Sequence, residues 1–357
     1  MIPAPRPQSP SLPAPLAWPT ARRLQKDRIG AVILSCLALA PCAAALVWMT
    51  RAAPEDRDGP AAFLALTLLL PAALGPVVRA LVDRRGRGLV LTALRGGPDA
   101  EVEIRARSGA GGGLVVPLRG RGSLGRVYRV GLKRMAVAEA LAQTAAGEVL
   151  FARGGTALDP DLVRWIGEVV ASPGLSRSRS ESPHVEEIAA RAARAPLDAP
   201  APIEPVRDRG WPAWRYRAAE PRGVGLAAAL LAVLMAWLIL FPRLGVFPLA
   251  VMATWIVPVS LLLVWSILLA GPLTVDLEVR GPMLIFRRRR FGVTLWTSVN
   301  DARQAGLDVS QLPFVALRCA GRLRGFTTPA VGGPDVAAMA WLSAAIRSSA
   351  LRGAPGP

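Results

Sequence analysis

The chain has 357 residues, of which 52% are hydrophobic, and its net charge is +18, carried almost entirely by arginine. Its three cysteines and its single histidine, His184, are too few and too scattered for a disulfide framework or for a zinc or iron centre. We therefore expect neither a metal nor a cofactor. So basic a chain suits nucleic acid or anionic lipid, but long apolar segments favour the positive-inside bias of a membrane protein instead.

Apolar residues gather in four blocks, and each block is long enough to cross about 30 Å of hydrocarbon as a helix, which takes about 20 residues. Short loops pair the blocks into two hairpins. A lipoprotein cleavage site before Cys36 is the weaker alternative for the first block, because too little apolar chain precedes it. The blocks lie at about 29–50, 61–81, 224–241 and 246–270.

Arginines flank the hairpins on one side. Arg22 and Arg23 precede the first hairpin, and further arginines from Arg280 onward follow the second. Basic loops favour the cytoplasmic side of a membrane. The sequence therefore predicts a multi-pass protein of the bacterial inner membrane with both termini in the cytoplasm. The predicted fold class is an α-helical membrane protein of four transmembrane helices, with two cytoplasmic α+β or small β-barrel-like domains, each closed by a C-terminal helix.

The expected domains follow this plan along the chain. They are a proline-rich tail at 1–28, transmembrane hairpins at 29–82 and 223–270, cytoplasmic units at 83–171 and 271–350, a disordered or interfacial linker at 172–222, and a tail at 351–357.

In the first cytoplasmic unit, residues 120–127 match the glycine loop GxGxxGxV of kinases. No His-Arg-Asp or Asp-Phe-Gly accompanies it, and residues 127–130 have the pattern of a strand. We interpret the glycines as a turn between strands and not as a phosphate site. Glu101 and Glu103 alternate on one strand face and are expected to be solvated.

The linker is rich in proline, serine and charge, a composition that does not bury enough surface to fold alone. His184 lies in it, so we assign it no catalytic role. Trp211, Trp214 and Tyr216 alternate with arginine just before the third apolar block, a pattern typical of an anchor at a membrane interface.

The second unit shows period-two alternation, which indicates half-buried strands. A helix through Trp341 and Leu342 closes it. The first unit ends in the same way, since a glycine and a proline thirteen residues apart precede a tryptophan-bearing helix in both, with Asp159 as N-cap in the first. We therefore predict an internal duplication. The strands expected in the second unit are 274–280, 283–289, 293–296, 313–319 and 322–327.

Four consecutive arginines, Arg287, Arg288, Arg289 and Arg290, form the strongest charge cluster. On a strand, alternate side chains face opposite sides, so the run forms one patch only if a bulge or turn intervenes. Contact with anionic lipid headgroups is one hypothesis, at about 1 kcal/mol for each basic group near the surface. A solvated face that helps to set topology is the other.

The second hairpin, its strands, the Arg287–Gly292 turn and the single terminal helix resemble bacterial pleckstrin-homology-like domain membrane proteins. The resemblance covers about residues 273–347 and, less closely, 89–172. It implies a scaffolding module that binds proteins or lipid headgroups, and it carries over no catalytic residues. The expected function is therefore non-enzymatic, with membrane lipids and other membrane proteins as partners. A transporter subunit and a membrane-surface enzyme of unrecognised type remain alternatives.

Overall fold

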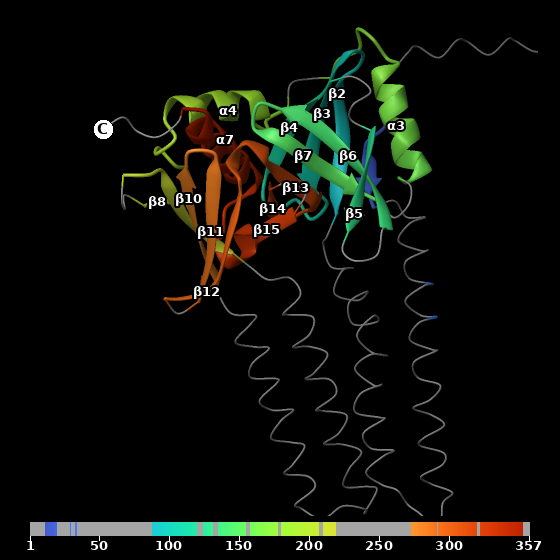
Figure 1. Ribbon diagram of the computed structural model, residues 1–357. Helices are drawn as coiled ribbons and strands as arrows, with labels where there is room; N and C mark the ends of the chain where they lie inside the picture. Colours follow the sequence, from blue (N-terminus) through green and yellow to red (C-terminus); the bar gives the residue numbers. More distant parts are fainter. Residues whose placement is uncertain are drawn as a thin grey trace, which may run out of the picture. The chain divides into compact units, whose positions relative to one another are not determined.

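The computed structural model describes residues 11–19, 88–119, 124–130, 135–154, 158–177, 180–206, 210–218, 273–290, 292–319 and 322–352, and the single positions 29 and 33 (Figure 1). Apart from those two positions, the described residues fall within one compact unit, which the chain enters three times.

Sheet A is a four-stranded antiparallel sheet with the order β1-β2-β3-β4. Alternation of apolar residues builds it: in β2, Leu89, Leu91 and Ala93 are buried while the residues between them are not. One face of the sheet therefore covers the core and the other faces outward. The strands are β1 (Leu16–Trp18), β2 (Leu89–Arg95), β3 (Asp99–Ala106) and β4 (Gly113–Arg119).

Sheet C repeats this arrangement in the second half of the chain, in the order β12-β11-β10-β9-β8. Leu273, Val275 and Leu277 of β10 are buried, and Asp276 lies on the outer face between them. The strands are β8 (Glu204–Pro205), β9 (Ala213–Ala218), β10 (Leu273–Arg280), β11 (Met283–Arg290) and β12 (Val293–Asp301).

Sheet B draws its strands from both halves of the chain, in the order β15-β14-β13-β7-β6-β5. The halves meet where β7 and β13 pair in parallel, with Leu307 opposite Val149. A Cβ atom on Gly306 would collide with the backbone carbonyl of Glu148, so glycine permits this close approach. The strands are β5 (Leu124–Val130), β6 (Met135–Thr144), β7 (Gly147–Arg153), β13 (Ala305–Gln311), β14 (Phe314–Cys319) and β15 (Arg322–Thr327).

Three α-helices occur among the described residues: α3 (Pro160–Val170), α4 (Val185–Arg194) and α7 (Val336–Arg352). Asp159 caps α3 by accepting a hydrogen bond from the Asp161 amide, as the sequence predicted. Asp335 accepts one from the Ala338 amide at the start of α7. The 3₁₀ turns η3 (Ala302–Gln304) and η4 (Pro329–Val331) flank the last three strands.

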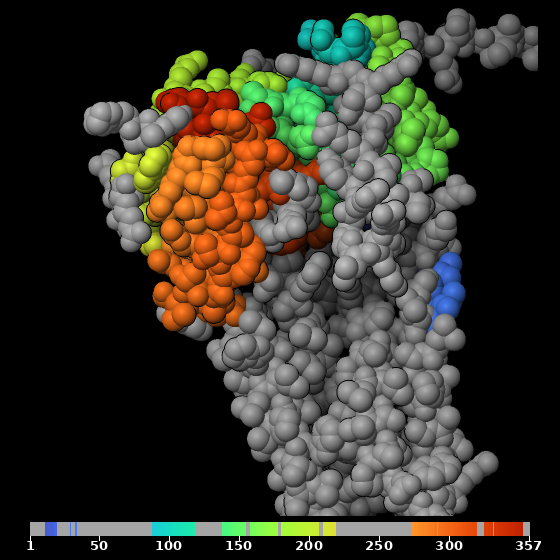
Figure 2. Space-filling model, in the orientation of Figure 1, coloured from blue at the N-terminus to red at the C-terminus, as the bar shows by residue number. Residues whose placement is uncertain are grey.

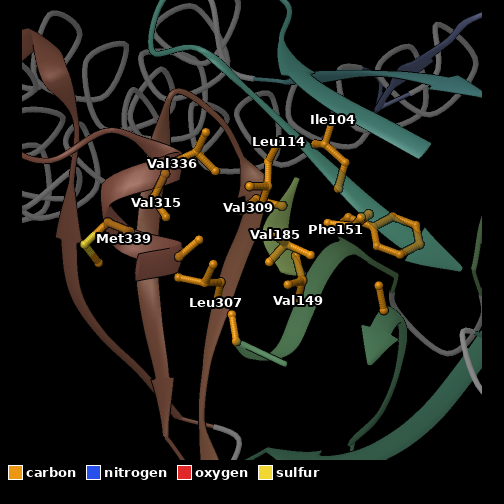
Figure 3. Packing of buried hydrophobic residues seen from close by; sticks show 14 of the residues in the cluster. Ile104, Leu114, Val149, Phe151, Val185, Leu307, Val309, Val315, Val336 and Met339 are labelled. Carbon is orange, nitrogen blue, oxygen red and sulfur yellow. The ribbon is translucent and has the colours of Figure 1, made fainter. Parts of the chain in front are cut away.

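Helix α7 is buried on nearly every side because it packs against α4 and against strands of sheet B. Figure 3 shows buried side chains of four elements in one cluster, among them Met339 of α7, Leu307 of β13, Val149 of β7 and Val185 of α4. Full burial of each such side chain stabilises the fold by about 1.5–3 kcal/mol. The cluster contains residues of both halves, so the halves share one core.

The order of elements repeats along the chain. The repeated order is one strand, three antiparallel strands, three further strands and a helix. It occurs first as β1, β2–β4, β5–β7 and α3, and again as β9, β10–β12, β13–β15 and α7. The five strands predicted in the second unit are all present. Of the predicted glycine turn, residues 120–123 lie outside the described residues, and Gly125 lies in β5. This order favours the predicted duplication.

The predicted fold class and localisation are corrected by this architecture. The described residues form three β-sheets with three α-helices, and none of these helices is long and apolar enough to cross a membrane. Within the described residues, many buried apolar side chains lie at alternate positions of strands, as in β2 and β10. The expected segments at 29–82 and 223–270 lie outside the described residues, apart from positions 29 and 33. For the described residues, the prediction of an α-helical transmembrane protein of the inner membrane is wrong.

The prediction of a disordered linker at 172–222 is also wrong for the residues that the structure describes there. They form α4, β8 and β9, and Val185 and Ala192 of α4 are buried. The composition argument failed because α4 does not fold alone: its apolar stripe packs against α7.

Candidate functional site

The outer face of sheet C carries a ladder of alternating charges. Arg215 of β9 and Arg289 of β11 both pair with Asp276 of β10, at 2.7 and 3.1 Å. Glu278 of β10 pairs in the same way with Arg280 at 2.6 Å and with Arg287 of β11 at 2.9 Å. The carboxylates are nearly buried beneath partly exposed guanidinium groups. The exposed layer of this face is therefore cationic.

A hollow of about 360 Å³ opens over this ladder. Three arginines and two carboxylates contribute to its wall, so its formal charge is positive. Thr294 and Thr297 of β12 add hydroxyl groups, and Arg289 donates a hydrogen bond to the Thr294 hydroxyl. In Figure 2 the orange residues of this half of the chain form a broad open surface. The lining residues are Val206, Ala213, Trp214, Arg215, Asp276, Leu277, Glu278, Arg287, Arg289, Thr294 and Thr297.

The pKa values of Arg215 and Glu278 reflect the ion pairs of the ladder. The hydrogen bond to Asp276 raises the pKa of Arg215 and outweighs partial burial. Burial alone would raise the pKa of Glu278, but hydrogen bonds and charges from Arg280 and Arg287 outweigh it and hold the pKa below its ordinary value. Both shifts favour the charged forms of Arg215 and Glu278.

The four arginines predicted as one cluster are divided between the two faces of β11. Arg287 and Arg289 face outward onto the ladder, whereas Arg290 is buried on the opposite side. A bulge between Arg288 and Arg289 shifts the register against β12. Half of the run therefore belongs to the site, and the alternation that the sequence indicated explains the division.

The predicted interfacial anchor is corrected. Trp214 and Tyr216 lie in β9 with exposed fractions of 0% and 2%, and only Trp211, just before the strand, is partly exposed. The Trp214 indole donates to the Pro196 carbonyl, and the Tyr216 hydroxyl donates to the Gly325 carbonyl. Aromatics alternating with arginine thus marked a strand with one face in the core.

Sequence reasoning missed Arg215, Asp276 and Glu278 as site residues. A signal was present, because the T-V-D-L-E-V-R pattern of β10 places both acids on the face opposite its buried residues. What the sequence did not provide was the neighbouring strand β9, which lies 55 positions earlier in the chain and supplies Arg215.

The outer face of sheet A is covered by the chain itself. Residues 175–177 and 180–184, called the strap here, run from the end of β2 across β3 to β4. Ser180 and Ser182 both donate to one oxygen of Glu103 at 2.5 Å, and Arg105 donates to it at 2.6 Å. Glu103, predicted to be solvated, is therefore buried. Burial favours a higher pKa, but these hydrogen bonds outweigh it and lower the pKa.

Within the described ranges, no group of three or more His, Cys, Asp or Glu side chains lies close enough together to hold a metal ion. His184, the base considered for a triad, lies beside Glu101 at 3.5 Å and directly precedes α4. Comparison with protein-family models, with curated proteins and with solved structures finds no match to this chain.

Proposed function

We propose that this chain is a non-enzymatic binding protein, and that the outer face of sheet C binds an anionic group carried by a partner protein. The observation that carries the proposal is the hollow over β9–β12, with its partly exposed arginines seated on nearly buried carboxylates. The carboxylates hold the guanidinium groups in place before a ligand arrives, which lowers the entropic cost of binding.

Arginine suits this role because its planar guanidinium carries five N–H donors, more than one carboxylate takes up. A second anion can then bind to the same groups. Hydrogen bonds between charged groups contribute about 1.5–3 kcal/mol where they are shielded from water. The Thr294 and Thr297 hydroxyls supply further donors at the β12 side of the hollow.

The repeated plan of strands closed by a helix supports a scaffolding role. It is the layout through which the sequence resembles pleckstrin-homology-like domains, which implies a binding module. The two halves share one sheet and one core, so the face of sheet C sits on a rigid support.

The test measures binding of a fluorescent ten-residue peptide of alternating Glu and Val to the purified full chain at 150 mM salt. The site variant is Arg287→Gln with Arg289→Gln. Glu278 keeps Arg280 and Asp276 keeps Arg215 in this variant, so the ladder stays neutralised. We expect at least a tenfold loss of affinity.

The control variant, Arg164→Gln with Arg191→Gln, removes the same charge from exposed positions on α3 and α4. It separates the site from the general attraction of a chain with net charge +18, and a loss below twofold is expected. Equal losses in the two variants would show that the peptide responds to net charge alone, and the proposal would fail.

A further inference from the structure

The two repeats have equivalent edge strands with different surroundings. In sheet A, Glu103 of β3 lies opposite Thr92 of β2 and Val115 of β4. In sheet C, Arg287 of β11 lies opposite Asp276 of β10 and Thr297 of β12. The two sets correspond in position, because Thr92 follows the first residue of β2, Leu89, by as many positions as Asp276 follows the first residue of β10, Leu273. The edge strands β4 and β12 therefore correspond.

The edge of β4 already accepts an extended segment. The Val115 amide donates to the Pro183 carbonyl at 3.0 Å, and Val115 forms a parallel bridge with His184. At the other end of the strap, the Arg177 amide donates to the Leu94 carbonyl of β2 at 2.8 Å. The strap is thus held by backbone bonds at the sheet and by side chains over its outer face.

Among the described residues, no strand pairs with the outer edge of β12. β12 is the terminal strand of sheet C, and its apolar side chains Val293, Leu295 and Val299 are 64%, 53% and 61% exposed. Trp296, packed edge-on against Phe286, is 38% exposed. A long apolar edge strand is a ready template for another strand, and proteins that leave one open commonly use it for pairing.

The central residues beside the two edges are opposite in charge, with Glu103 in β3 and Arg287 in β11. The face next to β4 presents Glu101, Glu103 and Arg105, and the strap meets the two acids with the Ser180 and Ser182 hydroxyls and with His184. The face next to β12 presents Arg287 and Arg289 at the corresponding strand. A segment that fills the second site in the same manner must bring acceptors, that is, carboxylates.

We infer that β12 is the docking edge for an extended acidic segment of a partner protein, which adds to sheet C as a further strand. The inference rests on the proposed function and names the form of its ligand. Acidic side chains at every second position lie over Thr294, Thr297 and the arginines behind them, and apolar side chains at the intervening positions lie beside Trp296.

A second copy of this chain is a poorer occupant. Pairing β12 with β12 joins two copies that each carry a charge of +18, with the arginine-bearing β11 strand of each copy directly behind the joined edges. Repulsion between two copies of such high positive net charge opposes this association. An acidic strand removes this repulsion and offers partners to the same guanidinium groups.

The experiment compares two ten-residue peptides of identical composition on the full chain. One alternates Glu and Val, and the other carries its five Glu before its five Val, so only the first can place its acids on one face of a strand. We expect the alternating peptide to bind at least tenfold more tightly. Hydrogen exchange of the complex should show slower exchange of β12 amides and unchanged exchange in β4, which the strap already occupies.

A variant adds a second, independent measurement. Thr297→Pro removes a backbone donor from the middle of β12 and should abolish the preference for the alternating peptide. Its far-UV spectrum and urea midpoint report whether it folds. If it does not fold, the peptide ratio and the β12 exchange of the natural chain decide the question alone.

The outcomes separate the two proposals. Equal affinities for the two peptides, both weakened by Arg287→Gln with Arg289→Gln, and unchanged β12 exchange would overturn the edge and leave the anion site standing. Affinities that do not depend on the two arginines would overturn both. Arginine-dependent binding to vesicles of phosphatidylcholine and phosphatidylglycerol, with neither peptide bound, would assign the face to a lipid surface and overturn the peptide.

Discussion

The outer faces of sheets A and C are built on the same strand plan, but they differ in how the chain covers them. Sheet A buries Glu103 under a strap of its own chain, whereas sheet C leaves its arginine ladder beside a hollow and an open edge. The covered face shows how such a sheet holds an extended segment, through backbone bonds at the edge and hydroxyl donors on a buried carboxylate. At the position of Glu103, sheet C carries Arg287, a charge of the opposite sign. Coverage, more than strand order, thus distinguishes the face that the chain itself covers from the face that we propose binds a partner.

The largest effect is expected where the two halves join, since the comparison depends on one rigid body. Glu139 of β6 pairs with Arg318 of β14 at 2.7 Å, and both side chains are 2% exposed. Arg153 of β7 adds a further pair at 2.7 Å. Glu139→Ala leaves a buried guanidinium without this carboxylate and should lower the free energy of unfolding by about 3–5 kcal/mol, measured in urea.

The matched control for the joint is Glu168→Gln, an exposed carboxylate on α3 that faces Arg164 at 4.0 Å. Its effect should stay within about 0.5 kcal/mol. A loss below about 1 kcal/mol for Glu139→Ala would indicate that the buried network does not hold the halves together.

A smaller effect is expected at the strap, and it should depend on pH. The pKa of Glu103 in the folded chain lies below its ordinary value of 4.5, so its stabilising effect is complete above that pH and is lost as the pH falls through the lowered pKa. Glu103→Gln should cost about 2 kcal/mol at pH 7, because two serine hydroxyls and Arg105 lose a charged acceptor.

The measurement is the difference in unfolding free energy between the natural chain and Glu103→Gln, taken in urea from pH 7 to pH 3. Other titrating groups contribute equally to both and cancel. Ser182→Ala, which removes one donor, should show a part of the same loss. A difference that does not change with pH would mean that the ionised carboxylate does not hold the strap.

The strands of sheet C could largely be predicted from sequence, because the apolar alternation of β10 and β11 is local information. The strand β13 was not predicted although A-G-L-D-V-S-Q alternates apolar and polar residues, and its pairing with β7, more than 150 positions earlier in the chain, could not be predicted from local sequence. Its Asp308 is buried and satisfied by Ser310, and burial raises its pKa.

The strap and α4 were missed for a related reason. Their serine- and arginine-rich composition is that of an unfolded linker, and only Glu103, about 80 residues earlier, makes the serines structural. In the candidate site, the arginine run and its division between two faces could be predicted. Asp276 and Glu278 beneath it became meaningful only once β9 and β11 were placed on either side of β10.

The smallest expected effect on stability is at the arginines of sheet C, and it distinguishes the outer faces of sheets A and C most clearly. Arg287→Gln with Arg289→Gln should lower the free energy of unfolding by less than about 1 kcal/mol, because partly exposed ion pairs contribute little and each carboxylate keeps a second arginine. The same variant is expected to lose tenfold in peptide affinity, whereas Glu103→Gln costs more stability and leaves that affinity unchanged. If the double variant instead lost more than about 2 kcal/mol in urea, beyond the usual range of exposed pairs, its arginines would be structural, as Glu103 is. Sheet C would then be a second covered face whose covering remains to be found, and not a site kept open for a partner.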